Sequence, residues 1–149
     1  MTPDLIFQVC GLLALIGWLL LIFGVYPRRL RELAPRVIAG GLIPALIACV
    51  YLAVMVTHWG EHKGGFNSLS DVTLLFTDRW LVLAGWIHYL AFDLFIGSWE
   101  VCEAQRLKIP HLIVIPCLLL TFMFGPVGWL CFYMLRLVYL RRSQSQIGS

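Results

Sequence analysis

Apolar residues dominate four long runs of the chain, and short polar segments separate these runs. The runs span residues 5–26, 37–57, 80–99 and 111–140. A helix needs about 20 residues to cross a hydrocarbon core about 30 Å thick. Each run meets that length, so the pattern predicts an all-α integral membrane bundle of four transmembrane helices.

The fourth run is the longest, and the dipeptide Gly125-Pro126 interrupts it. Proline removes a backbone donor and clashes with the preceding turn of a helix. We therefore predict one last helix that is kinked or tilted at this dipeptide. Two short half-helices are the alternative.

The longest polar connection, residues 58–79, contains a helix signal of its own. Gly64-Gly65 indicates a turn, and Ser70 followed by Asp71 starts an apolar stretch that reaches Phe76. This stretch predicts a short helix that lies at the membrane interface.

The composition supports the same class of protein. Of the 149 residues, 60% are hydrophobic and 13% are charged, and the mean hydropathy is +0.87. A soluble domain of this size does not bury so many apolar side chains. The length favours a single membrane domain over residues 1–149. The first run lacks a basic leader and is longer than the apolar part of a signal peptide, so we expect it to be retained as a helix.

Charged residues indicate how the helices are oriented. The net charge of +3 comes from arginines beside apolar runs, which is typical of a topology signal and argues against a nucleic-acid partner. The segment PRRLRELAPR, residues 27–36, is expected to face the cytoplasm. The N-terminus and residues 58–79 would then lie outside, with residues 100–110 inside. Arg141 and Arg142 fall on the wrong side of this arrangement, and a re-entrant fourth segment would correct it.

Disulfide and metal chemistry have little support in the sequence. The five cysteines are odd in number and scattered, without a CxxC pair, which predicts free and packed thiols. His58 and His62, with Glu61 beside them, would chelate a metal only in a helix, and neighbouring glycines oppose one. We expect neither a metal nor a cofactor.

The stretch GWIHYLAFDLFIGSWE, residues 85–100, places polar residues inside the third run. Asp93 lies roughly 5 Å from the centre of that run at 1.5 Å per residue. A carboxylate at this depth costs about 2.5 to 3.5 kcal/mol on insertion into the membrane. We therefore expect Asp93 to face a partner, a wet cavity or a ligand.

Helical spacing indicates which of these side chains share a face. Trp86, Asp93 and Glu100 recur every seven residues, and Tyr89 precedes Asp93 by four, so the four lie on one face. His88 lies roughly 140° around the helix from Asp93, too far for a direct pair. Glu100 is about 10 Å further along the axis. Its alternative interpretation is a solvated helix end balanced by nearby cations.

Three stretches of the chain are specific enough to compare with known families: GGFNSL (64–69), LAGWIHYLAFDLFIGSWEV (83–101) and IPHLIVIPCLLLTFMFGPVG (109–128). They resemble the abscisic-acid-deficient-four-like family, whose plant members are associated with neoxanthin synthesis. The resemblance covers roughly residues 37–140, and the last stretch is more similar to the bacterial branch than to the plant proteins. It implies an integral protein of a bacterial inner membrane.

The resemblance also implies chemistry on a carotenoid or a related isoprenoid. Converting violaxanthin to neoxanthin is a redox-neutral isomerisation, in which an epoxide opens while a proton leaves the polyene, giving an allene and a tertiary alcohol. Such a step requires an acid, a base and a slot for a long apolar molecule. The candidate acid/base residues, in order, are Asp93, His88, Glu100 and His111. The candidate substrate-binding residues are Trp86, Tyr89, Phe92 and Pro116.

Two other functions stay open at this point. A non-catalytic protein that binds a pigment or a lipid would use the same slot. A small proton-coupled transporter would use Asp93 and His88 as a relay, and it would require a homo-oligomer because four helices are few for a pathway. In each case the expected partners are membrane lipids and an apolar small molecule.

Overall fold

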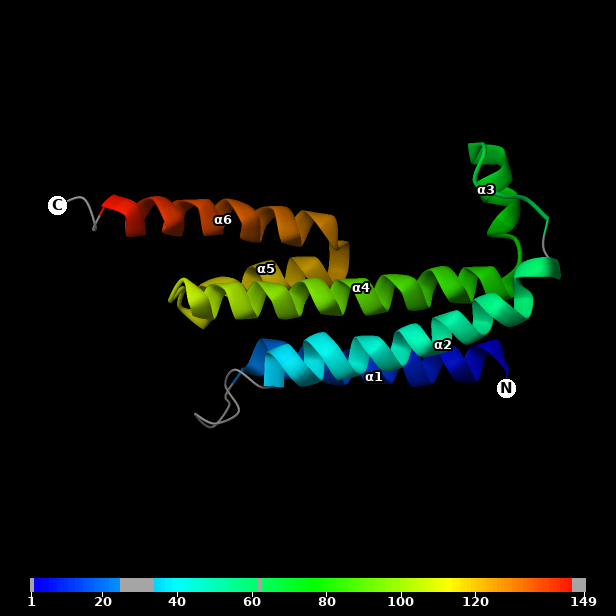
Figure 1. Cartoon of the computed structure of the whole chain (residues 1–149), viewed down its shortest axis with the longest axis horizontal. Coiled ribbons are helices and arrows are strands. Elements are labelled where there is room, and N and C mark those ends of the chain that lie inside the picture. The colour runs from blue at the N-terminus through cyan, green and yellow to red at the C-terminus, as the bar shows by residue number, and fades with distance from the viewer. Residues whose placement is uncertain (1, 25–33, 62, 146–149) are drawn as a thin grey trace.

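The computed structural model describes residues 2–24, 34–61 and 63–145, and all regular elements of these parts are helices (Figure 1). In chain order they are α1 (Pro3–Phe23), a π-helical segment η1 (Ala34–Leu42), α2 (Ile43–His58), a 3₁₀ turn η2 (Trp59–Glu61), α3 (Leu69–Leu75), α4 (Arg79–Arg106), α5 (His111–Phe124) and α6 (Pro126–Ser145).

Three helical stretches within the described residues are long and apolar enough to cross a membrane. They are Pro3–Phe23, Ala34–His58 and Arg79–Arg106. The second of these stretches consists of η1 and α2, which follows it directly. The chain is therefore a membrane-embedded, all-α protein, and three of the four predicted spans are present. The third is longer than predicted, because α4 continues to residue 106 instead of ending at residue 99. At 1.5 Å per residue α4 is about 42 Å long and extends beyond a hydrocarbon core of about 30 Å.

The prediction of a single kinked fourth helix is wrong. Residues 111–140 belong to two helices, α5 and α6, which lie side by side and run in opposite directions (Figure 1). Gly125 has a φ of +47°, a left-handed conformation that glycine adopts readily. Pro126 then becomes the first residue of α6, where its missing N–H is not needed. The dipeptide therefore reverses the chain, which is the half-helix alternative, instead of bending one helix.

A second glycine allows the two half-helices to lie close together. A Cβ at Gly128 of α6 would overlap the backbone nitrogen and the side-chain oxygen of Thr121 on α5. Any larger residue at position 128 would force the helices apart. The turn between α5 and α6 lies beside Asp93, in the middle of α4. The hairpin therefore enters the bundle only as far as the middle of α4 and returns to the end from which it came.

The central helix of the bundle is α4, which contacts α1, η1, α2, α5 and α6. Of its most apolar stretch, 50% is buried, compared with 28% in each of the other two spans. Small side chains permit this close packing. A Cβ at Gly97 would meet the ring of Trp18 on α1, and Ser98 Oγ donates a hydrogen bond of 2.6 Å to the carbonyl oxygen of Pro35.

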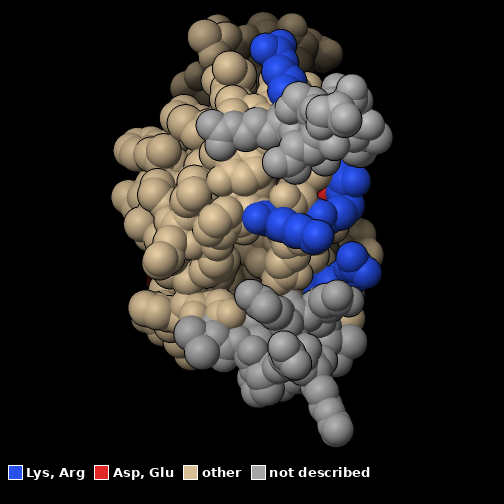
Figure 2. Space-filling view, turned by 90° about the vertical axis from the view of Figure 1, so that its left-hand side faces the viewer, with Lys and Arg blue, Asp and Glu red and all other residues tan. Residues whose placement is uncertain are grey.

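The hairpin gathers cationic side chains at one end of the bundle, where η1 begins and where α4 and α6 end (Figures 1 and 2). The described cations at this end are Arg36, Arg106, Lys108, Arg136 and Arg141. Arg141 thus lies at the same end as Arg106, which removes the conflict with the positive-inside rule. The arginines at positions 28, 29 and 31 lie outside the described residues.

The predicted short helix is present at the opposite end of the bundle as α3 (Figure 1). Ser68 caps it, because its Oγ accepts a hydrogen bond of 3.1 Å from the backbone nitrogen of Asp71. Its location at a membrane interface stays a prediction. The five cysteines form no disulfide, as predicted, although only Cys10 and Cys117 are buried.

Candidate functional site

Asp93 lies at the midpoint of α4 and beside the α5–α6 turn. A Cβ added to Gly125 would lie 3.1 Å from Asp93 Oδ1 and 3.2 Å from Oδ2. The Oδ2 atom is buried, and no described residue forms a hydrogen bond with it. Leaving a buried polar atom without a partner costs about 1–3 kcal/mol. Such an atom in a folded protein calls for an explanation, and a role in chemistry is one.

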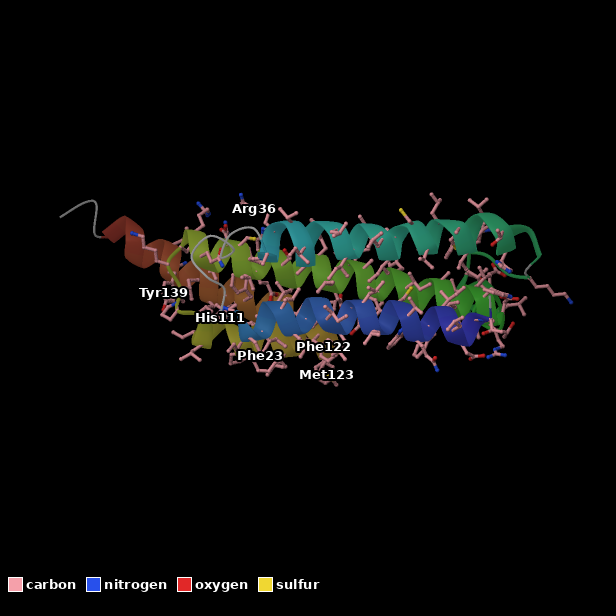
Figure 3. All side chains as sticks on the ribbon, turned by 90° about the horizontal axis from the view of Figure 1, so that it is seen from below. Phe23, Arg36, His111, Phe122, Met123 and Tyr139 are labelled. Atoms are coloured by element: carbon pink, nitrogen blue, oxygen red, sulfur yellow. The ribbon has the colours of Figure 1, made fainter. Side chains whose placement is uncertain are left out.

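The hydroxyl group of Tyr89 lies between Asp93 and the end of α5. It donates a hydrogen bond of 2.9 Å to the carbonyl oxygen of Phe122, and the Asp93 carboxyl group is a second partner of this side chain. The hydroxyl carries a single proton, so the two acceptors compete for it. Figure 3 shows Phe122 on the α5 side of the bundle, partway along its length.

A row of aromatic rings leads from the surface of the bundle to this pair. The Trp86 ring lies 5.4 Å from that of Tyr89 and 5.6 Å from that of Phe7 on α1, measured between centroids. Phe7 is 47% exposed and Trp86 is 42% exposed. In a membrane this surface faces lipid, so the outer end of the row is open to the bilayer.

Glu100 is completely buried in the same face of α4. Thr121 Oγ1 donates a hydrogen bond of 2.8 Å to Glu100 Oε1, and Oε2 is buried without a partner among the described residues. The interpretation of Glu100 as a solvated helix end is wrong, because α5 covers it. The nearby cations pair instead with Glu103, whose largely buried carboxylate accepts hydrogen bonds from Arg106 at 2.7 Å and Arg136 at 2.6 Å.

Tyr89, Asp93 and Glu100 all face the hairpin, as their helical spacing predicts. With Thr121 and Gly125 of the hairpin they form what we term the hairpin site. Interrupted helices at mid-membrane depth are tolerated where protein buries them or where they line a cavity. In transport proteins such interruptions form the substrate and ion sites. The hairpin site has both the interruption and the polar groups.

His88 lies on another flank of α4. Its ring centroid is 4.7 Å from that of Phe92 and 5.7 Å from that of Tyr51 on α2. It also lines a cavity of about 250 Å³ together with residues of α2, α3 and α4 such as Leu75. The structure therefore does not bring His88 or Phe92 to Asp93.

His111 and Pro116 lie on α5 but away from its turn. His111 Nε2 is 3.0 Å from the carbonyl oxygen of Ile22, and Figure 3 shows His111 near Phe23 at the end of α1. About 20 Å of helix separates His111 from Gly125, at 1.5 Å per residue. Its contact satisfies a carbonyl group in the last turn of α1. Pro116 is exposed within α5 and makes no polar contact with the hairpin site.

The described residues contain no group of three side chains suited to a metal. Of the histidine pair considered for chelation, His62 lies outside the described residues. His58 stacks on Trp80 with 3.9 Å between ring centroids, and its Nδ1 is 2.7 Å from Thr57 Oγ1.

Sequence reasoning missed Thr121 and Gly125, which contact α4, and Gly128, which lets α6 lie against Thr121. The signal was present, because these small residues recur at intervals of four and three in TFMFGPVG. Such spacing is typical of membrane helices that approach closely. It becomes informative only if Gly125-Pro126 is taken as a reversal of the chain.

Comparison with known protein families matches residues 5–132 of the chain to the family described as ABA DEFICIENT 4-like. The match includes all of α1 to α5 beyond the first residues, and the first part of α6. No curated protein and no solved structure matches the chain.

Proposed function

The chain belongs to the ABA DEFICIENT 4-like family, and from this premise we propose that it is an enzyme that isomerises a carotenoid or a related isoprenoid at the hairpin site. The observation that carries the proposal is the buried Asp93 oxygen without a partner among the described residues, located at mid-helix and beside the Tyr89 hydroxyl. The similarity of its last matching stretch to the bacterial branch favours a bacterial inner membrane.

The proposed step is an exchange of protons without change of oxidation state. The Asp93 carboxylate removes a proton from a polyene carbon, and that electron pair forms a new carbon–carbon double bond. The adjacent epoxide C–O bond breaks, and the Tyr89 hydroxyl gives its proton to the departing oxygen, which becomes a hydroxyl group. The proton then passes from Asp93 to the Tyr89 oxygen beside it, so that both groups regain their starting protonation states. A positioned acid and base typically contribute 10²- to 10⁴-fold in rate.

Tyr89 serves as the second group in this proposal because its hydroxyl reaches Asp93. His88, by contrast, packs on Tyr51 and Phe92. The aromatic row of Phe7, Trp86 and Tyr89 supports an apolar substrate, because a rigid polyene gains contact with rings at little cost in conformational entropy.

The test is expression in a bacterial host that accumulates an epoxy-carotenoid such as violaxanthin. An isomerase converts it to a product of identical mass with a different retention time and absorption spectrum. We expect Asp93→Asn and Tyr89→Phe each to lower the rate by about 100-fold or more, because each removes one proton-transfer group. Protein level in the membrane is measured in parallel.

His88→Gln is the matched control, since it changes a polar residue of the same helix that faces another flank. It should leave the rate within about twofold of the original protein. A normal rate for inserted Asp93→Asn would refute the catalytic assignment. A loss in His88→Gln equal to that in Asp93→Asn would refute the choice of the hairpin site.

A second candidate function is non-catalytic binding of a pigment or lipid, and a groove between α1 and α2 favours it. The groove has a volume of about 650 Å³ and is lined mostly by apolar side chains, with His58 and Trp80 at one end. Mass spectrometry of molecules that copurify with the protein separates the two functions. A carrier retains the carotenoid unchanged, and Asp93→Asn does not alter the product profile of the cells.

A further inference from the structure

A second pocket lies on another flank of α4 from the hairpin site and extends to the cationic end of the bundle seen in Figure 2. It has a volume of about 510 Å³ and is formed by residues of η1 and α4. Two arginines line it, Arg36 from η1 and Arg106 from α4, together with Phe95, Trp99 and Glu103. Figure 3 shows Arg36 at the start of η1, at the same end of the molecule.

The charge around this pocket is positive. Arg106 gives two hydrogen bonds to the Glu103 carboxylate and keeps three of its five N–H groups for other acceptors. Arg136 of α6 pairs with the same carboxylate. Arg36 is exposed, and no carboxylate of a described residue pairs with it. One negative and three positive groups therefore meet here.

Below the charges the pocket wall is aromatic. Phe95 is 52% exposed, and Trp99 is half-buried against Phe132 with 5.6 Å between ring centroids. Trp99 precedes Arg106 by seven residues, so it lies about 10 Å deeper along α4. Because α4 is longer than the hydrocarbon core, Arg106 falls at the level of lipid headgroups and Trp99 near the interface.

We propose that this pocket binds an anionic phospholipid of the phosphatidylglycerol type. Arg36 and Arg106 hold the phosphate, and the first part of an acyl chain covers Phe95 and Trp99. Basic pockets between membrane helices at the cytoplasmic face bind such headgroups. A zwitterionic lipid is disfavoured because its ammonium group would lie among the same arginines. This site does not depend on the reaction proposed for the hairpin site.

The experiment is native mass spectrometry of the purified full-length protein, titrated with phosphatidylglycerol, phosphatidylcholine or inorganic phosphate. The variants are Arg36→Gln, Arg106→Gln, the double variant and Arg36→Lys. Arg141→Gln is the matched control, because it removes the same charge from the same end but outside the pocket. Circular dichroism confirms that each variant is folded.

We expect phosphatidylglycerol to bind in preference to phosphatidylcholine. Each arginine-to-glutamine change should weaken phosphatidylglycerol binding roughly fivefold, with little effect on phosphatidylcholine. Arg36→Lys should keep most of the preference, and Arg141→Gln should keep all of it.

Three outcomes would overturn the proposal. The first is equal binding of the two lipids by the original protein. The second is a loss in Arg141→Gln as large as that in Arg36→Gln, which would mean that general surface charge is responsible. The third is displacement of phosphatidylglycerol by inorganic phosphate at similar concentrations, which would mean that the pocket recognises a free anion.

Discussion

Thr121 provides the only hydrogen bond that the described residues give to the buried carboxyl group of Glu100, and its removal should therefore be costly. Thr121→Ser and Thr121→Ala both remove the same methyl group, but only alanine also removes the hydroxyl. Comparing these two variants isolates the hydrogen bond from the packing change.

The expected magnitude follows from the burial of Glu100. Without Thr121 Oγ1, both oxygens of a completely buried carboxyl group lack a described partner. This state costs about 1–3 kcal/mol relative to the bonded one. Alanine is a better helix former than serine by about 0.5 kcal/mol, and this gain partly masks the loss.

The same pair of Thr121 variants is therefore also made in a Glu100→Met background, where methionine fills a similar volume without a polar group. The difference in helix propensity between serine and alanine is the same in both backgrounds, so it cancels when the two are compared. In that background the serine hydroxyl of the Thr121→Ser variant has a local acceptor in the carbonyl group one turn earlier. The alanine variant should then be as stable as the serine variant or slightly more stable. We therefore expect a coupling of about 1–3 kcal/mol between the two positions.

Stability is measured as unfolding in mixed micelles of a mild detergent and sodium dodecyl sulfate, followed by circular dichroism. If the difference between serine and alanine is the same in both backgrounds within about 0.5 kcal/mol, the Thr121–Glu100 hydrogen bond does not stabilise the hairpin. The inference that this hydrogen bond stabilises the packing of α5 against α4 would then be incorrect.

Gly128→Ala should force α6 away from α5 and lower the free energy of unfolding by about 1–3 kcal/mol, whereas Gly11→Ala, where an added Cβ meets no atom within 4 Å, should not be destabilising. Equal effects in the same unfolding assay would contradict the close packing of the hairpin. His111→Ala should cost about 0.5–1.5 kcal/mol by removing its hydrogen bond to α1, yet carotenoid turnover should be unchanged; a large loss of turnover in stable protein would return His111 to the site. Cysteines introduced at Lys63 and Arg141 should react with a membrane-impermeant reagent from opposite sides of the membrane. Labelling of both positions from the same side would exclude the re-entrant hairpin.

The membrane class and three of the spans followed from sequence because they depend on local properties. Length, hydropathy and the absence of charge in a run decide whether a helix can cross a bilayer, whatever its neighbours are. The grouping of Tyr89, Asp93 and Glu100 on one face was also accessible, since helical phase is set by the backbone alone. For the same reason the sequence separated His88 from Asp93.

Local patterns did not show that the α5–α6 hairpin packs against the face of Tyr89, Asp93 and Glu100. Gly125-Pro126 fits a kink and a reversal equally well, because proline is tolerated both at a bend and at the first position of a helix. Only the packing decides between them: the missing side chain of Gly128 admits Thr121, and Thr121 in turn meets Glu100.

The sequence by itself determined that this chain lies in a membrane, which of its residues are costly at that depth, and which of them share a helix face. The tertiary structure alone decided that the fourth apolar segment turns back beside the middle of α4, that Glu100 is covered, and that Arg141 returns to the end of Arg106. The physical reason is that hydropathy and helical period act within a segment, whereas the direction of a chain after a glycine depends on contacts between segments far apart in sequence.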